Sequence, residues 1–310
     1  MVKIIEKLRN IFMPIYRIND LPEFLVSVKR KKKIVIFTTK HCIFVANLLA
    51  DTLNKMNINT TIIFKKPKWG YSDLPHIVVC PYVSNDLPVN YIAFQMEQSE
   101  SSNWFSQEYF IKLNKAVAVF DYSLQNVEYL KKHLENANKI FYLPLSINKK
   151  FLNKYSEKLS DRKYDVLFYG GITSLRREKI LDKLKSKYRV KIITDKFGED
   201  LYNELSSAKI IVNIHFYENA LLETTRLCEC LSLNNNVIIS ERGRDQEQHT
   251  FLEEFIDFVD DGDIDGLVHK IDYYLSDNNL MSDKINKNKI SLANLTSTEF
   301  ENKLKCIFKL

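Results

Sequence analysis

A turn with two adjacent glycines follows a short apolar run and precedes a helical pattern. Gly170 and Gly171 come directly after residues 165–169, and Arg176 and Arg177 lie in the helical segment that follows. Glycine lets the backbone approach a ligand closely, and a helix N-terminus favours phosphate through its free N–H groups and its dipole. The two arginines add bidentate donors for a diphosphate. The spacing is not G-x-G-x-x-G, so a phosphate site and a purely structural turn are both open interpretations.

The stretch over residues 213–241 holds the densest set of polar side chains. His215 follows a predicted strand, at the edge where open α/β sheets bind ligands. Glu223, Arg226 and Glu229 are spaced by three residues, so they form a row along a predicted helix. Charged groups are rarely fully buried unless they are paired. The row therefore either pairs internally, as a salt-bridged helix face, or lines a cleft that binds a ligand.

Short β-branched runs alternate with amphipathic segments along the chain, and this alternation must position the polar residues. Strands are predicted at 34–37, 60–64, 77–80, 91–94, 116–120 and 139–143, then at 165–169, 190–193, 210–214 and 237–240. Helices are predicted at 44–56, 106–113, 123–133, 175–187, 200–206, 222–231 and 264–275. The pattern favours parallel sheets covered by helices on both faces.

A polar connection rich in Lys and Asn interrupts the alternation, which then restarts in the same style. We therefore assign residues 1–147 to an N-terminal α/β domain and residues 163–294 to a C-terminal α/β domain. Residues 295–310 are expected to form a last helix that packs back on the N-terminal domain.

The predicted helix at 222–231 resembles a known signature. The segment Arg226-Leu-Cys-Glu229-Cys-Leu-Ser, followed by Val237-Ile-Ile-Ser-Glu241, is similar to the R-x-x-E-A … G-x-P-V-I signature of GT-B glycosyltransferases. The resemblance covers most of residues 165–275, and residues 91–98 and 118–123 look like the N-terminal domain of the same group. It implies an α/β protein with two Rossmann-like α/β/α domains facing across a cleft. Residues 1–147 would then form the acceptor domain and residues 163–294 the nucleotide-sugar donor domain. The glutamate matching Glu229 would hydrogen-bond the ribose of a nucleotide-sugar donor, which suits a carboxylate because it accepts from both hydroxyls.

The sequence departs from this signature at three positions. Asn234 and Asn236 stand where the family has glycine and proline. Because asparagine tolerates the left-handed conformation better than most residues, we expect the helix to stop there in the same way. The first glutamate of the family's E-x7-E pair falls at Leu221, and Glu218 or Glu223 is expected to replace it.

The resemblance also implies a catalytic base in the N-terminal domain. His41 lies in a loop directly after the first predicted strand. In several inverting GT-B enzymes a histidine in this loop deprotonates the acceptor hydroxyl, and the pKa of histidine suits that work. Glu97, after the strand at 91–94, is the alternative base. Each residue also has an alternative interpretation. His41 could be an ordinary surface or capping residue, and Glu97 could bind the acceptor or brace the interface between the domains.

No metal site is expected. Residues 261–266, Asp-Gly-Asp-Ile-Asp-Gly, match most of a calcium-loop pattern, but the segment before them is a predicted strand, whereas an EF-hand needs helices on both sides. We interpret these carboxylates as N-caps of the next helix. The five cysteines lie at positions 42, 80, 228, 230 and 306, without the C-x-x-C spacing of a zinc site. Reduced, mostly buried thiols are expected.

Composition narrows the class of protein without naming a substrate. The 310 residues are 45% hydrophobic and 27% charged, which is typical of a soluble globular protein, and the net charge is +6. No run of about 18 apolar residues and no secretory signal is present, so a cytoplasmic protein is expected. Apolar residues at helical spacing near the N-terminus predict an amphipathic helix that packs on its own domain or contacts a membrane surface peripherally. Those residues are Ile4, Ile5, Leu8, Ile11 and Phe12.

Together these patterns predict a metal-independent glycosyltransferase of the hexosyltransferase type, without a cofactor. The donor is expected to be a UDP- or GDP-sugar, and the acceptor a hydroxyl of a glycan or lipid-linked molecule. The donor-binding candidates are Gly170, Gly171, Arg176, His215, Glu223, Arg226 and Glu229. One alternative is a non-catalytic nucleotide-sugar or glycan-binding module of the same fold. A nucleic-acid-modifying transferase is a further alternative, but no basic stripe interleaved with aromatics is visible, so no nucleic-acid partner is expected.

Overall fold

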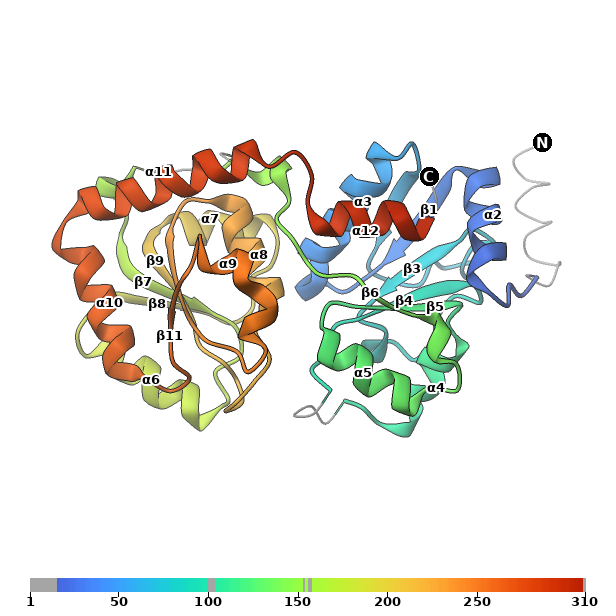
Figure 1. The fold of residues 1–310 in the computed structure, drawn as a ribbon, viewed down its shortest axis with the longest axis horizontal. Coiled ribbons are helices and arrows are strands. Elements are labelled where there is room, and N and C mark those ends of the chain that lie inside the picture. The colour runs from blue at the N-terminus through green and yellow to red at the C-terminus, as the bar shows by residue number, and fades with distance from the viewer. Residues whose placement is uncertain (1–15, 100–103, 153, 156–157, 309–310) are drawn as a thin grey trace. The chain divides into compact units, whose positions relative to one another are not determined.

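The computed structural model describes residues 16–99, 104–152, 154–155 and 158–308. The chain divides into two compact units: unit 1 comprises Met1–Pro144 and Glu299–Leu310, and unit 2 comprises Leu145–Thr298. Each unit holds a parallel sheet with helices on both faces (Figure 1). The amphipathic helix predicted near the N-terminus lies outside the described residues. Within the described part of the chain, no helix is long and apolar enough to cross a membrane.

Unit 1 is built around six parallel strands in the order β2-β1-β3-β4-β5-β6. The inner strands are buried along almost their whole length, as expected when helices cover both faces. The strands are β1 (Lys33–Phe37), β2 (Asn59–Ile63), β3 (His76–Val79), β4 (Tyr91–Gln95), β5 (Ala118–Asp121) and β6 (Ile140–Tyr142). The helices are α2 (Leu21–Lys31), α3 (Ile43–Lys55), α4 (Gln107–Lys115), α5 (Leu124–His133) and α12 (Glu299–Phe308).

The C-terminal helix α12 belongs to unit 1 although unit 2 separates it in sequence from the rest of that unit. Phe300, Leu304 and Phe308 are buried and lie four residues apart, so they form one apolar stripe along the helix. Glu301 accepts a hydrogen bond from Lys55 Nζ at the end of α3, at 2.5 Å. The helix therefore lies beside α3 (Figure 1).

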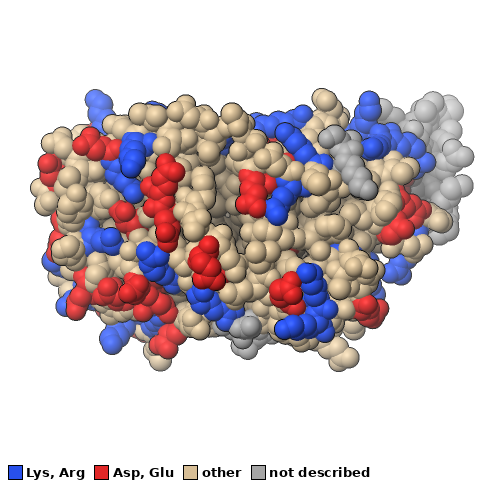
Figure 2. Space-filling model, viewed as in Figure 1, with Lys and Arg blue, Asp and Glu red and all other residues tan. Residues whose placement is uncertain are grey.

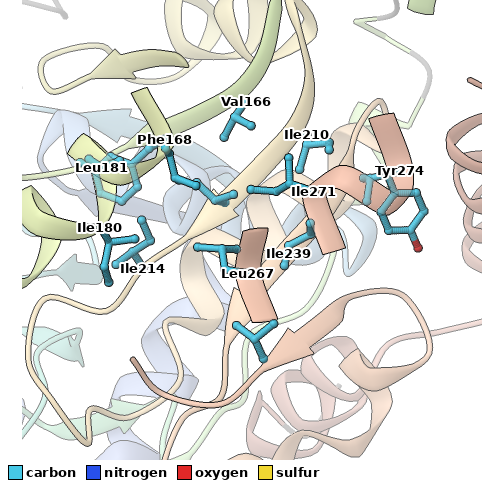
Figure 3. Close-up of a cluster of buried hydrophobic side chains, with 14 of the residues drawn as sticks. Val166, Phe168, Ile180, Leu181, Ile210, Ile214, Ile239, Leu267, Ile271 and Tyr274 are labelled. Atoms are coloured by element: carbon cyan, nitrogen blue, oxygen red, sulfur yellow. The ribbon is translucent and has the colours of Figure 1, made fainter. Parts of the chain in front are cut away.

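Unit 2 has five parallel strands in the order β11-β10-β9-β7-β8. Its core joins the strands to the covering helices, and Phe168, Ile210 and Ile239 pack with Leu267 and Ile271 of α10 (Figure 3). The strands are β7 (Tyr164–Tyr169), β8 (Val190–Ile193), β9 (Ala208–Asn213), β10 (Val237–Glu241) and β11 (Asp257–Val259). The helices are α6 (Leu175–Lys185), α7 (Glu199–Ser206), α8 (Thr224–Leu233), α9 (Thr250–Glu253), α10 (Ile264–Ser276) and α11 (Asn278–Asn294).

Two local expectations from the sequence are confirmed at helix ends. Helix α8 ends at Asn234, whose φ of 47° and ψ of 43° are left-handed, so asparagine takes the place of the family's glycine. Asn236 then donates from Nδ2 to the carbonyls of Leu205 and Ala208, at 2.9 and 2.6 Å. At the start of α10, Asp263 accepts from the backbone N–H of Gly266 at 2.8 Å, which is the predicted N-cap.

Candidate functional site

Each sheet has one point at which the strand order reverses direction. In unit 1, β1 lies between β2 and β3, and in unit 2, β7 lies between β8 and β9. Open α/β sheets bind ligands at the carboxyl ends of the strands flanking such a switch point. His41 follows β1, Gly170 and Gly171 follow β7, and His215 follows β9. The fold therefore brings these predicted residues to the two positions at which a ligand is expected.

The two glycines after β7 have different roles. Gly170 has a φ of +134°, and a Cβ added there would lie 2.7 Å from Nη2 of Arg226. Gly171 has ordinary backbone geometry, and its nearest neighbour would be a Phe216 ring carbon at 3.9 Å. Gly170 is thus required both by the backbone conformation and by the close approach of an arginine, whereas Gly171 is not.

Glu223 joins two arginines beside this turn. Its carboxylate pairs with Arg177 Nη2 at 2.8 Å and also with Arg226 Nη1. Arg226 Nη1 donates in addition to Asn213 Oδ1 at 2.7 Å, at the end of β9. Burial opposes ionisation of Glu223, but Arg226 and Arg177 hold its pKa below the usual range. Two members of the predicted row, Glu223 and Arg226, therefore pair with each other.

Arg177 is turned into unit 2, and its donors are used there. Its Nε donates to Ile214 O at 2.8 Å and its Nη1 to Gly171 O at 2.9 Å. The guanidinium carbon lies 5.2 Å from the ring centroids of both Phe168 and Phe216. Burial lowers the pKa of Arg177 to about 10. The arginine thus holds the loops after β7 and β9 together, and its side chain is only 3% exposed.

Arg176 occupies the neighbouring position and pairs with carboxylates from two other loops. It donates from Nη1 to Glu241 Oε2 at 2.8 Å and from Nη2 to Asp261 Oδ1 at 2.5 Å. Glu241 also accepts from the backbone N–H of His215 at 2.7 Å and of Gly262 at 3.0 Å. Arg176 and Glu241 therefore tie the loops after β9, β10 and β11 to the first turn of α6.

His215 is fully buried at this edge. Its Nε2 lies 3.2 Å from the carbonyl oxygen of Glu241. Its Nδ1 has no hydrogen-bond partner within the described part of the chain. If Nε2 carries the proton and donates to Glu241, Nδ1 is a buried acceptor ready to receive a hydrogen bond from a ligand.

Glu229, the predicted ribose ligand, faces two tyrosines. Tyr169 donates to its Oε2 at 2.9 Å and Tyr202 to its Oε1 at 3.1 Å. Burial raises the pKa of both tyrosines, so their hydroxyls stay protonated as donors. The two tyrosines therefore hold the carboxylate of Glu229 through one hydrogen bond to each oxygen.

The structure separates the candidates for the missing glutamate of the E-x7-E pair. Leu221 is fully buried, Glu218 is exposed, and Glu223 is held by Arg177 and Arg226. Glu218 is therefore the candidate whose carboxylate faces solvent.

In unit 1, His41 lies among cysteines, a feature that the sequence did not indicate. Its Nε2 is 3.4 Å from Cys80 Sγ at the end of β3, and its Nδ1 is 3.0 Å from Thr39 Oγ1. Hydrogen bonding to Cys42, together with the negative charges of Cys42 and Glu97, raises the pKa of His41 against the effect of burial. Hydrogen bonds from Cys80 and His41 lower the pKa of Cys42 to about 6. Both cysteines are buried.

Glu97 lies in a loop held by a buried polar network. Its carbonyl accepts from Gln95 Nε2 and from Asn126 Nδ2, each at 2.8 Å. Gln95 also donates to Asp121 Oδ2 at 2.6 Å. Burial raises the pKa of Asp121 to about 8 although it accepts several hydrogen bonds. This network fixes the Glu97 backbone near His41.

Charge on the surface is mixed in sign. Figure 2 shows Lys and Arg interspersed with Asp and Glu on the visible face. One short loop after β2 differs, because Lys65, Lys66, Lys68 and Trp69 are all exposed. Trp69 is 71% exposed, and Lys68 Nζ lies 5.4 Å from its ring centroid. The sequence pattern did not indicate this basic, aromatic loop, which lies at the same carboxyl edge of the sheet as His41.

A cavity of about 910 Å³ in unit 1 lies away from these residues. It is lined by residues that precede β5 and β6, including Val117 and Lys139, and by Phe308 of α12. Because these positions mark the amino ends of the strands, the cavity is at the opposite edge of the sheet from His41.

Comparison with solved structures defines the class of fold. An α-glucosyltransferase in complex with UDP-glucose and DNA containing an abasic site aligns over 89% of this chain and 99% of its own, with a TM-score of 0.61 at 12% identity. Sucrose-phosphate synthase from Thermosynechococcus elongatus aligns over 89% and 98%, with a TM-score of 0.56 at 11% identity. Anabaena HepE in complex with UDP and glucose aligns over 90% and 100%, with a TM-score of 0.54 at 10% identity. The chain has the GT-B glycosyltransferase fold, as the sequence predicted.

Sequence comparison adds relatives without a known activity. Two uncharacterized proteins of Acanthamoeba polyphaga mimivirus are 29% and 26% identical over 164 and 198 residues. These alignments cover 53% and 61% of this chain, and 55% and 62% of the relatives. A third uncharacterized protein of the same virus matches over 17% of its length. No protein-family model matches the sequence.

Proposed function

We propose that this protein is a glycosyltransferase that takes its sugar from a UDP- or GDP-sugar without a metal ion or cofactor. The carrying observation is the placement of Gly170, His215 and Glu229 around the switch point of unit 2, within a GT-B fold. Two of the similar structures contain UDP-glucose or UDP with glucose. The acceptor in this proposal is a hydroxyl group of a glycan or a lipid-linked molecule.

The donor diphosphate would be bound at the turn after β7. Ser174, the N-cap of α6, donates to Phe216 O at 2.9 Å and does not accept from the first turn of the helix, which leaves those N–H groups for an anion. Arg176 and Arg226 are 13% and 15% exposed, so their guanidiniums can reach a ligand, whereas Arg177 positions the loops. Backbone N–H groups and arginines would then stabilise the leaving diphosphate in place of a metal.

The base that deprotonates the acceptor would come from unit 1. The two candidates are His41, which follows β1 at the switch point, and Glu97, which follows β4. A raised pKa keeps His41 protonated at higher pH, which weakens a histidine as a base. Glu97, whose backbone carbonyl is held by Gln95 and Asn126, is our preferred base.

The first prediction concerns donor binding. With EDTA present, a UDP- or GDP-compound at about 100 times its dissociation constant should stabilise the protein by roughly 2.7 kcal/mol, which raises the melting temperature by several degrees. Glu229→Gln should weaken this binding about tenfold because it replaces the charged acceptor of the ribose hydroxyls. Glu204→Gln is the matched control, since Glu204 pairs with the lysines Lys191 and Lys196 in the same unit.

No shift with any nucleotide, with EDTA or after adding magnesium and manganese, would exclude the donor site. The protein would then be a non-catalytic module that kept the fold. If Glu229→Gln binds the nucleotide as tightly as the wild type does, Glu229 is not a donor-binding residue. The proposed transferase activity would not be affected by that result.

A nucleic acid is a second candidate acceptor, favoured by the exposed basic loop after β2. Lysines would contact phosphates, and Trp69 offers a face on which a base can stack. The similar α-glucosyltransferase was solved with DNA. The exposed basic loop is the reason to test DNA as an acceptor, although no nucleic-acid partner was expected from the sequence.

If DNA is the acceptor, Trp69→Ala should lower its affinity about tenfold, because stacking on one aromatic contributes roughly 1–3 kcal/mol per base. Fluorescence anisotropy of a labelled DNA, measured at several salt concentrations, reports both the affinity and the number of phosphate contacts. Tyr273→Ala, an exposed aromatic on α10, is the control. If the wild-type protein does not bind DNA, or binds it with no dependence on salt, DNA is excluded as the acceptor. The proposed acceptor is then the glycan or lipid-linked molecule.

A further inference from the structure

Three side chains of the types that bind zinc meet at the switch point of unit 1. The ligand atoms of His41, Cys42 and Cys80 all lie within 4.8 Å of one another. His41 and Cys42 come from the loop after β1, and Cys80 comes directly after β3. Cys42 and Cys80 are 5% and 1% exposed, whereas His41 lies on the solvent side. The cluster is therefore assembled by the sheet and not by a local sequence motif.

The distances suit a tetrahedral metal. With Zn–S near 2.3 Å and Zn–N near 2.0–2.1 Å, a tetrahedral site separates the sulfur from the nitrogen by about 3.6 Å, and two sulfurs by about 3.8 Å. The observed distance from His41 Nε2 to Cys80 Sγ is 3.4 Å, and the other separations fall within the 4.8 Å limit. The three ligand atoms are therefore close enough together for small side-chain movements to bring them onto one ion.

The surroundings hold two of the ligands in place. Cys80 has a φ of 65° and a ψ of 57°, a left-handed conformation that is rare for a residue other than glycine, and Pro81 follows it. Such conformations persist where neighbouring structure imposes them, and they concentrate at functional sites. On the other side, Thr39 Oγ1 lies 3.0 Å from Nδ1 of His41 and 3.3 Å from Nε2, so a small turn of the ring would leave this hydroxyl on Nδ1, the nitrogen that the metal would not use. A partner at that nitrogen fixes the ring of a metal-binding histidine.

We propose that His41, Cys42 and Cys80 bind one zinc ion, through Nε2 and the two sulfurs. As the two Zn–S bonds form, each thiol releases its proton to solvent, and the two thiolates balance the charge of Zn²⁺. Three protein ligands leave the fourth position for water or another small ligand, as in zinc sites that remain open. The site uses unit 1 alone and needs neither donor nor acceptor, so it stands independently of the proposed transferase activity.

Zinc at this site has a consequence for the choice of base. The metal occupies the Nε2 lone pair, so His41 cannot accept a proton while zinc is bound. Glu97 is not among the three ligands and would keep its capacity. Zinc should therefore inhibit transfer if His41 is the base and have little effect if Glu97 is.

Binding is tested first with Co²⁺, a coloured substitute for zinc, on the full-length chain after chelation and under a thiol-free reductant. One equivalent of Co²⁺ should bind and give the near-ultraviolet charge-transfer absorption of thiolate coordination, and Zn²⁺ should displace it. His41→Ala and Cys80→Ser should each lower the affinity for Zn²⁺ at least about 100-fold. The exposed residue Cys306 supplies the control Cys306→Ser, which should bind as the wild type does.

Because His41 is exposed, His41→Ala keeps the result interpretable if a cysteine variant fails to fold. Absence of the charge-transfer absorption in the wild type would overturn the proposal. So would unchanged affinity in both His41→Ala and Cys80→Ser. Finding Cys42 and Cys80 joined in a disulfide after full reduction and re-exposure to air, with no metal uptake by the reduced protein, would make the pair a redox couple instead.

Discussion

Glu223→Gln should lower the free energy of unfolding of unit 2 by about 3–5 kcal/mol. The substitution leaves the side chains of Arg177 and Arg226 in place without their shared carboxylate. Arg177 is 3% exposed and cannot recover hydration without leaving its contacts with Ile214 and Gly171. Removing one partner of a buried ion pair costs this much because an uncompensated charge stays buried.

The two units offer separate signals for this measurement. Trp69 and Trp104, the two tryptophans of the chain, are both in unit 1. Far-ultraviolet circular dichroism in urea follows both units, so the part of its transition that tryptophan emission does not follow reports unit 2, and the midpoint of that part should fall by more than about 1 M. The tryptophan emission midpoint should stay nearly constant.

Glu199→Gln is the control for Glu223→Gln. Glu199 pairs with Lys154 in the same unit, but its side chain is 74% exposed, and exposed pairs contribute about 0–1 kcal/mol. A loss of similar size in both variants would mean that burial of the Glu223 cluster does not matter for stability. If only the midpoint of tryptophan emission fell, the substitution would have destabilised unit 1, which contradicts the prediction.

Gly170→Ala should have the second largest effect, on stability and donor binding together. Alanine at a φ of +134° is strained by roughly 1–3 kcal/mol, and its Cβ would lie 2.7 Å from Arg226 Nη2. Arg226 must then move away from Asn213 and Glu223. We expect a melting temperature several degrees lower and a nucleotide affinity reduced at least about tenfold.

The adjacent glycine provides a control for that substitution. In Gly171→Ala the new Cβ would meet nothing closer than 3.9 Å, and the backbone needs no positive φ. Calorimetric nucleotide titration and thermal unfolding of both variants should therefore separate them clearly. Equal behaviour of the two variants would show that the approach of Arg226 to Gly170 has no role in the site.

Three helices went unpredicted, namely α2, α9 and α11, and α9 has only four residues. Helix α2 carries a clear signal, because Asp20 accepts from the N–H of Glu23 and Pro22 stands in the first turn. The helix ends in the basic residues Lys29, Arg30 and Lys31, which interrupt its apolar pattern. Helix α11 is mostly polar, with Met281, Asn288 and Leu292 as its buried residues. The apolar residues of α11 show little helical periodicity, so the sequence gives only a weak indication of a helix. Its burial depends on packing against the rest of unit 2.

The sequence by itself determined the strands, most of the helices and the α/β class of the fold. Alternating apolar runs specify the parallel sheets because strands covered on both faces must be apolar throughout, and these runs became β1, β3 and β4. Local chemistry was also sufficient at two helix ends. The left-handed backbone of Asn234 ends α8, and the side chain of Asp263 caps the start of α10. Such features depend on neighbours within a few residues, so they can be inferred without a fold.

Tertiary structure decided which charged residues face a ligand and which hold the protein together. Arg176 and Arg177 are adjacent and equivalent in sequence, yet Arg177 is buried between two phenylalanines while Arg176 stays partly exposed. Cys42 and Cys80 lie far apart in sequence, and their approach follows from the pairing of β1 with β3. Long-range strand order and side-chain direction set these outcomes, and neither is encoded in the spacing of nearby residues.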